Sequence, residues 1–101
     1  MVDAYNELGT AFREEGLLDE AITYYKKTLL FNPSRDDTYY NMGIVFKEKG
    51  LFEEAIANYQ KAIQINPRHI DAYNNLGIVL QDNKQLDEAI TCYRKALQID
   101  D

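Results

Sequence analysis

Adjacent acidic side chains are the groups in this sequence that could carry out acid/base chemistry. They recur every 34 residues as Asp19–Glu20, Glu53–Glu54 and Asp87–Glu88. Two carboxylates act as general acid and base only when their surroundings push their pKa values apart. Here the same pair returns at the start of each second apolar stretch, where negative charge complements a helix dipole. The repetition therefore favours a structural role for the pairs.

His69 and Cys92 are the only histidine and the only cysteine in the chain. His69 has no second histidine or cysteine near it in the sequence, so a metal site is not expected. Cys92 takes a position that Tyr24 and Asn58 hold in earlier repeats, which predicts a partly exposed outer face rather than a nucleophile. No glycine-rich phosphate loop, zinc-ligand spacing or nucleophile elbow is present. We therefore expect no catalytic residue, no metal and no cofactor.

The composition is that of one globular domain. The chain has 101 residues, of which 46% are hydrophobic and 28% charged, and its formal net charge is −6. A nucleic-acid binder needs a basic footprint, so this balance favours neutral to basic protein partners and no nucleic acid. One cysteine forms no internal disulfide, the N-terminus lacks a signal-peptide pattern, and no apolar run is long enough for a membrane. We expect a cytoplasmic protein.

The elements that position these residues repeat with the same period of 34. The recurring sets are Gly9, Gly43 and Gly77; Ala21, Ala55 and Ala89; Tyr25, Tyr59 and Tyr93; and Tyr5, Tyr39 and Tyr73. Apolar spacings of three and four predict six helices and no strand, over 2–15, 18–31, 36–49, 53–65, 70–83 and 87–99. Pro33 and Pro67 end the second helix of their repeats. A period of this size predicts stacked copies of one helical hairpin.

The turn inside each hairpin has its own signal. Gly16 and Gly50 stand where a left-handed backbone is favourable for glycine, and Lys84 takes this place in the third repeat. Either Lys84 adopts the strained conformation or Asn83 adopts it instead.

These residues resemble the tetratricopeptide repeat (TPR). The second copy reads Tyr39, Met42, Gly43, Phe46, Ala55, Tyr59, Ala62 and Pro67. The resemblance covers essentially all of residues 1–101, with repeats at 2–35, 36–69 and 70–101. It implies an all-α fold, a right-handed TPR solenoid of three helix-turn-helix repeats that forms a single domain. The TPR pattern often carries a further helix after its last repeat. We expect no such C-terminal capping helix here, and interpret the chain as part of a longer array or an engineered excision.

In the family, the first helices of the repeats line a concave groove that binds peptides or helices. Counting by the period predicts groove columns, which include Thr10, Ile44 and Ile78 in one, and Arg13, Lys47 and Gln81 in another. We predict that the following residues form the peptide-binding groove: Asp37, Tyr40, Asn41, Ile44, Lys47, Asp71, Asn74, Asn75 and Ile78. Tyr40 is either an anchor for a partner side chain or a filler between first helices.

Two ligand types known for the family can be compared with these positions. Some TPR domains hold the C-terminal carboxylates of chaperones. Here Asn41 matches one clamp position, but Asp71 stands at another and repels a carboxylate, so we do not expect this ligand. Asn41 and Asn75 also look like an asparagine ladder, and their surroundings are similar to repeats of the O-GlcNAc transferase TPR superhelix, where such amides bind peptide backbone.

Three functions are consistent with the sequence. The first is a noncatalytic protein-protein interaction scaffold that binds a polypeptide segment in the groove. The second is self-assembly, in which the uncapped ends of the stack dock head to tail through Ile90, Tyr93 and Leu97. The third is a substrate-selecting fragment of a larger enzyme such as a glycosyltransferase.

Overall fold

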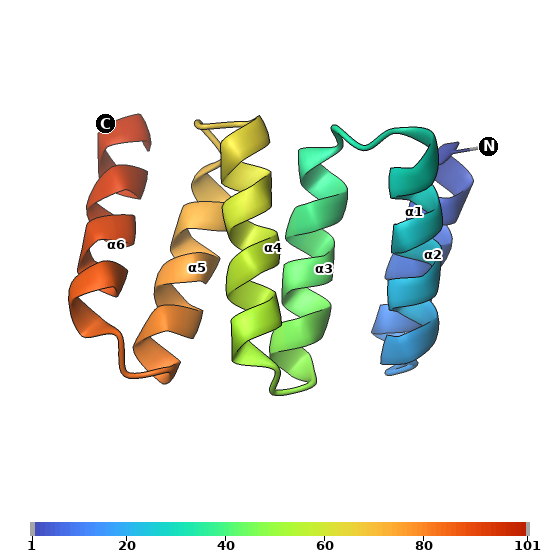
Figure 1. Ribbon diagram of the computed structural model, residues 1–101, viewed down its shortest axis with the longest axis horizontal. Helices are drawn as coiled ribbons and strands as arrows, with labels where there is room; N and C mark the ends of the chain where they lie inside the picture. The colour runs from blue at the N-terminus through green and yellow to red at the C-terminus, as the bar shows by residue number, and fades with distance from the viewer. Residues whose placement is uncertain (1, 101) are drawn as a thin grey trace.

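Six α-helices and no strand make up residues 2–100, which are the residues that the computed structural model describes. The helices are α1 (Val2–Glu14), α2 (Leu18–Phe31), α3 (Asp36–Glu48), α4 (Phe52–Ile65), α5 (Ile70–Asp82) and α6 (Leu86–Asp100). They form three consecutive hairpins that stand side by side, with α1 and α6 at opposite ends (Figure 1). The predicted all-α solenoid is confirmed, and the predicted helix bounds differ from these by at most one residue. None of the described helices has the length and apolar character that a membrane span needs.

The two kinds of connection differ as the sequence predicts. Inside the first hairpin, Gly16 has a φ of 81° and the Leu17 amide donates to the carbonyl of Phe12 at 2.8 Å. This is a Schellman turn, which satisfies carbonyls at the end of a helix. Between hairpins, the Asn32 and Asn66 side chains each accept from the amide two residues on, at 3.1 Å. These short Asx turns reverse the chain before α3 and α5.

The third hairpin resolves the choice left open by the sequence. Lys84 itself adopts the left-handed conformation, with a φ of 66°, while Asn83 has a φ of −89°. The Gln85 amide still donates to the Leu80 carbonyl at 2.8 Å, so the turn keeps the geometry of its glycine counterparts. A left-handed backbone costs a residue with a Cβ roughly 1–2 kcal/mol.

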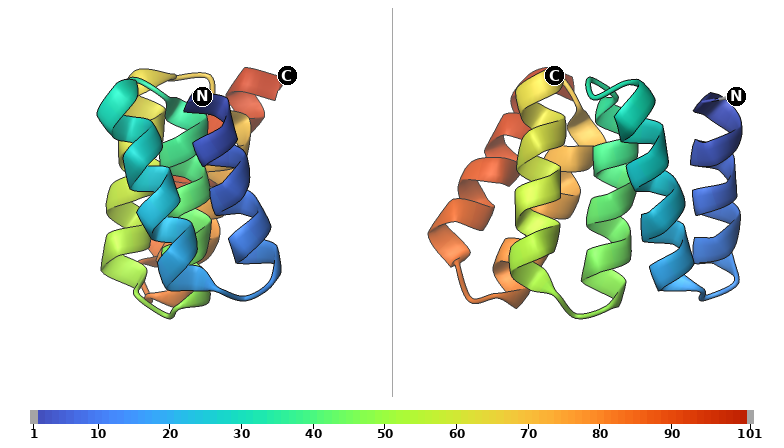
Figure 2. Two further views of the ribbon diagram at one scale, coloured as in Figure 1. Left: turned by 90° about the vertical axis from the view of Figure 1, so that its right-hand side faces the viewer. Right: turned by 45° about the vertical axis from the view of Figure 1, so that its right-hand side comes forward.

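The core lies between hairpins as well as within them. One cluster joins α2 to α3 through Ala21, Ile22, Tyr25, Met42 and Val45. A second joins α4, α5 and α6 through Ala55, Ile56, Tyr59, Leu76, Val79, Leu80 and Ala89. Phe46 packs against both clusters and connects them. Each hairpin therefore depends on its neighbour for burial, as stacked repeats require. The right-hand view in Figure 2 shows the hairpins one after another, and the left-hand view looks along the stack.

A close contact between glycine and tyrosine sets the spacing inside every hairpin. A Cβ placed on Gly9, Gly43 or Gly77 would lie 2.5–2.7 Å from the ring of Tyr25, Tyr59 or Tyr93 respectively. Carbon atoms in contact normally stay about 3.5–4.0 Å apart. The ring therefore occupies the volume that a methyl group would need.

Gly43→Ala is expected to destabilise the protein by about 1–3 kcal/mol, because the new methyl overlaps the buried Tyr59 ring. Helix propensity alone predicts the opposite, a gain of about 1 kcal/mol. Urea unfolding distinguishes the steric loss from the propensity gain. The variant Ala57→Gly, at an exposed site of α4, measures the effect of helix propensity alone. A Gly43→Ala variant that is more stable than wild type would contradict the contact.

Candidate functional site

A cavity of about 240 Å³ lies where α3 and α5 meet over α4. Its lining residues are Ile44, Lys47, Glu48, Tyr59 and Asn75. We call it the inner cavity. It brings together three of the predicted groove residues, Ile44, Lys47 and Asn75. The list of predicted groove residues includes neither Glu48 nor Tyr59.

Tyr40 and Asn75 are joined to each other across the seam between the second and third repeats. The Asn75 amide Nδ2 donates to the Tyr40 hydroxyl at 2.8 Å. The Tyr40 ring also lies beside the rings of Tyr59 and His69, at centroid distances of 6.0 and 4.8 Å. Burial, and after it the charge of Asp71, raises the pKa of Tyr40 above its ordinary value. Tyr40 therefore fills space between helices, and one Asn75 proton of the predicted ladder is already engaged.

Asp37 is held by an arginine that sequence reasoning did not select. Arg35 donates to both carboxylate oxygens of Asp37, at 3.1 and 2.6 Å, and to Asp3 at 2.9 Å. The Arg35 hydrogen bond holds the pKa of the Asp37 carboxyl below its ordinary value. This bidentate pair fixes the orientation of the Asp37 carboxylate. Asp3, Asp37 and Arg35 thus stabilise the junction of the first two repeats.

The remaining predicted groove residues are more open. Asn41 is half-buried, Asp71 is exposed, and Ile78 is 38% exposed. Asn74 does not line the inner cavity, because its side chain is turned by about 100° around α5 from that of Asn75.

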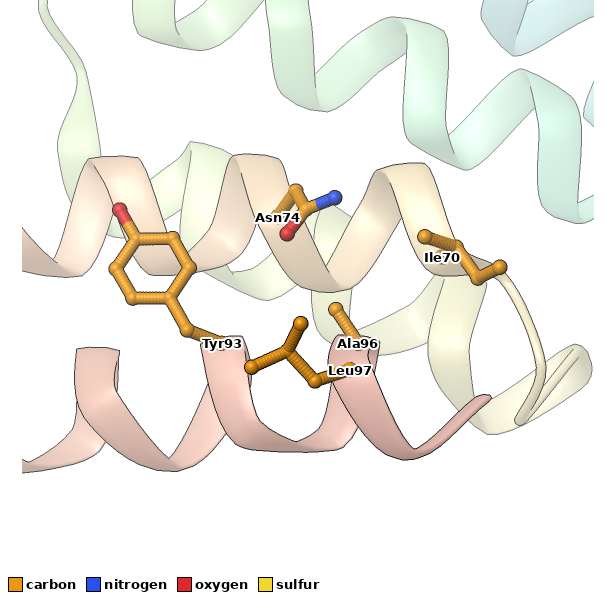
Figure 3. Close-up of a pocket in the computed structure, with 5 residues that line it drawn as sticks. All are labelled: Ile70, Asn74, Tyr93, Ala96 and Leu97. Atoms are coloured by element: carbon orange, nitrogen blue, oxygen red, sulfur yellow. The ribbon is translucent and has the colours of Figure 1, made fainter. Parts of the chain in front are cut away.

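Asn74 belongs to a second cavity, of about 250 Å³, at the α6 end of the stack. Its lining residues are Ile70, Asn74, Tyr93, Ala96 and Leu97. Figure 3 shows Tyr93 and Leu97 extending from α6 toward Asn74 and Ile70 on α5. We call this the end cavity. Two of the three residues predicted for self-association line it, and the third, Ile90, is 47% exposed nearby on α6.

Tyr59 has a buried hydroxyl without a partner. The residue is fully buried, and its Oη makes no hydrogen bond within residues 2–100. Burial raises the pKa of Tyr59 well above its ordinary value, so the hydroxyl keeps its proton. The equivalent Tyr25 hydroxyl is 2.8 Å from Thr10 Oγ1, and that of Tyr93 donates to Gln81 Oε1 at 3.0 Å. The signal was present in the sequence, because Ile44 and Lys47 replace these two acceptors.

His69 and Cys92 take structural positions. The His69 Nδ1 accepts from the Ala72 amide at 3.1 Å and so caps the start of α5. The Cys92 thiol is half-buried, and burial raises its pKa. Among residues 2–100 no group of three potential ligands lies close enough to hold a metal ion.

The sequence matches known repeat families along its length. The family described as "TPR repeat" matches residues 9–50 and 45–84, and the one described as "Tetratricopeptide repeat" matches residues 70–101. The chain belongs to the tetratricopeptide repeat family, whose members are protein-interaction modules. A search of the curated proteins gives no significant match.

Solved structures share the fold. Two crystal structures of MamA superpose with TM-scores of 0.96 and 0.93, each at 31% identity. They cover 99% and 98% of this chain, which spans only 58% and 54% of theirs. The first TPR domain of Spaghetti (RPAP3), bound to the HSP90 peptide SRMEEVD, has a TM-score of 0.93 at 23% identity, with 97% of this chain and 78% of that one covered. The similarity to O-GlcNAc transferase repeats stays a prediction.

Tyr59→Phe and Tyr25→Phe are expected to differ in their effect on stability. Tyr25→Phe removes a hydrogen bond to Thr10 and should cost about 1 kcal/mol. Tyr59→Phe removes an unpartnered buried hydroxyl and should be neutral, or stabilising by up to about 1 kcal/mol. Urea unfolding at neutral pH measures both changes. Equal losses in the two variants would show that Tyr59 has a partner in solution.

Proposed function

We propose that the protein is a noncatalytic scaffold that binds a polypeptide segment along α1, α3 and α5. The inner cavity is the observation that supports this proposal, because Ile44, Lys47 and Asn75 come together there from two different repeats. Ligand sites in proteins are typically concave, mostly apolar and fitted with a few polar groups. Ile44 and the Tyr59 ring are the apolar part of this cavity, and the other three residues are polar.

Charge favours a neutral or basic segment. The chain carries a net charge of −6, and Asp71 and Glu48 are both exposed beside Tyr40 and the inner cavity. Lys47 and Arg13 are the neighbouring cations, and Arg13 pairs with Glu48 at 3.7 Å. The HSP90 peptide in the Spaghetti (RPAP3) structure contains two glutamates and an aspartate. Asp71 would repel such a segment, so we propose that acidic tails bind less well here than neutral or basic ones.

Selection from a random peptide library, followed by calorimetric titration, tests this function. The double variant Asn41→Ala/Asn75→Ala should bind the selected peptides at least about tenfold more weakly, a loss of about 1.4 kcal/mol in binding free energy. Asn58→Ala is the matched control, since the Asn58 amide only donates to the Glu54 carbonyl of its own helix at 2.8 Å. Tyr40→Phe separates loss of the Asn75–Tyr40 bond from loss of a ligand contact. Equal affinity of wild type and the double variant for every selected peptide would refute binding through these asparagines.

Head-to-tail association is a second candidate, because the two ends of the stack are complementary in register. Ala72, Leu76 and Val79 on α5 are buried against the second hairpin. Two repeats earlier, the same places on α1 hold Ala4, Leu8 and Ala11, all of them exposed, Leu8 to 41%. The end cavity, in turn, is formed by residues of α5 and α6 that lie 34 positions after their counterparts on α3 and α4. In the second repeat, this surface is covered by α5. A second copy of this chain could therefore pack its α1 on α5 and α6 of the first copy, in the way that α5 packs on α3 and α4 within one chain.

Leu8→Glu and Leu97→Glu should each abolish this association, because each places a charge in one half of a heterologous contact. Wild type is expected to form growing oligomers with concentration, whereas an equimolar mixture of the two variants should stop at dimers. Sedimentation velocity up to millimolar concentration measures this. A wild type that stays monomeric throughout would contradict the candidate. No described residue favours the third alternative, substrate selection for a larger enzyme, which stays a prediction.

A further inference from the structure

Tyr59 lines the inner cavity, and its buried hydroxyl is a hydrogen-bond donor that no described residue accepts. Its ring is fully buried, its hydroxyl is unpartnered within residues 2–100, and the residue lines the cavity. A buried polar group that is left unpaired destabilises the protein, and a ligand that pairs with it removes this cost. The position is therefore one where a partner group is energetically favoured.

The other repeats show which partner this hydroxyl takes. Thr10 Oγ1 donates its proton to the Asn6 carbonyl at 3.2 Å, so Tyr25 is the donor in the bond between the two hydroxyls. Tyr93 likewise donates, to the amide oxygen of Gln81 at 3.0 Å. In both cases the tyrosine donates to an uncharged oxygen supplied by the first helix of its own hairpin.

The second repeat lacks both acceptors. Ile44 stands where Thr10 stands in the first repeat, and Lys47 stands where Gln81 stands in the third. An alkyl chain accepts no hydrogen bond, and an ammonium group has donors only. Neither position therefore supplies an acceptor for Tyr59 among the described residues, and a bound group could supply it.

The surroundings of the hydroxyl limit the chemistry of that group. A second buried donor without a partner, Arg13 Nε, belongs to the guanidinium that pairs with Glu48 at 3.7 Å. The Glu48 carboxylate, which lines the inner cavity, is an acceptor only. An oxygen at this point could accept from both Tyr59 and Arg13 Nε, and an N–H beside it could donate to the exposed Glu48 carboxylate.

We propose that the inner cavity selects a glutamine or asparagine side chain of the bound polypeptide, an inference that rests on the function proposed above. A side-chain amide carries both an acceptor oxygen and two N–H donors, on an apolar stem suited to Ile44. Lys47 and Arg13 attract a carboxylate, but a carboxylate offers acceptors only and has no N–H for Glu48. An apolar side chain of the same length leaves the Tyr59 hydroxyl unpaired, and sites with buried polar groups discriminate strongly against such analogues.

Three capped amino acids of similar length test the preference directly: N-acetyl-glutamine methylamide, N-acetyl-methionine methylamide and N-acetyl-glutamate methylamide. Each is titrated into the 101-residue protein while amide chemical shifts are followed by NMR. We expect the glutamine probe to bind at least about fivefold more tightly than either of the others, with shifts concentrated at Ile44, Glu48 and Asn75. Equal affinity for the glutamine and methionine probes would overturn the proposal.

Two variants assign the preference to Tyr59. Lys47→Gln copies the third repeat into the second and gives the hydroxyl an internal amide, and Tyr59→Phe removes the hydroxyl. Both should reduce the preference for glutamine over methionine to less than about twofold. Lys61→Gln is the matched control, because Lys61 is exposed on α4 and does not line the inner cavity. A preference that persists in both Lys47→Gln and Tyr59→Phe would also overturn the proposal.

The outcome is separable from that of the proposed function. Selected peptides that need Asn41 and Asn75 but show no amide preference would leave the scaffold function in place and refute only this inference. A glutamine preference without any selected peptide would establish the amide site and refute polypeptide binding as its use.

Discussion

The contact between a glycine of the first helix and a tyrosine of the second is the constraint on which the structure depends. In all three hairpins the ring lies where the glycine would carry its Cβ, and in two of them the tyrosine is fully buried. This contact fixes how closely the two helices approach. It also places the tyrosine hydroxyl within hydrogen-bonding distance of first-helix residues such as Thr10 and Gln81. The residue that packs the hairpin is thus also the residue that places a donor at the inner surface.

Scaffold and specificity separate at this hydroxyl. The tyrosine ring packs against the glycine in all three repeats, whereas the hydroxyl meets Thr10, no described residue, and Gln81 in turn. Replacing an acceptor on the first helix therefore changes the surface chemistry without disturbing the core. Ile44 is such a replacement: it costs the fold a hydrogen bond and gives the second repeat a donor for an external group. A repeat protein acquires a binding site in this way at a position where one copy departs from the others.

The sequence predicted the fold closely and the site only in part, and the difference has a physical basis. Helix bounds follow from glycine, proline and the apolar period, which act locally. For the third turn, the same signals left only Lys84 and Asn83 as candidates for the left-handed conformation. The groove residues were chosen by helical phase, which gives the face of a helix but not the partner of a side chain. The Asn75–Tyr40 bond and the Arg35–Asp3 pair depend on the spacing of neighbouring repeats. The recurrence of Tyr59 with Tyr25 and Tyr93 is typical of core residues, and the structure does bury its ring. The sequence shows that Ile44 and Lys47 replace Thr10 and Gln81, but whether another side chain pairs with the Tyr59 hydroxyl depends on the packing of the helices.

At each junction between repeats, a first-helix residue forms a hydrogen bond to the next repeat. This recurring contact also determines which residue lies at the end of the stack. Asn6 accepts a hydrogen bond from Thr38, and Tyr40 accepts one from Asn75, so this column of first-helix residues always faces the next repeat. Asn74 is the third member of the column, and in the third repeat it lines the end cavity. If a second copy continued the array, the same offsets would bring Asn74 opposite Ala4 and Glu7 of that copy, and an amide facing a carboxylate is a favourable pair. Stacking would therefore use Asn74 and leave Asn75 and the inner cavity open. Peptide binding and head-to-tail stacking would use adjacent residues, Asn75 and Asn74, on different faces of α5. The two proposed activities are therefore compatible.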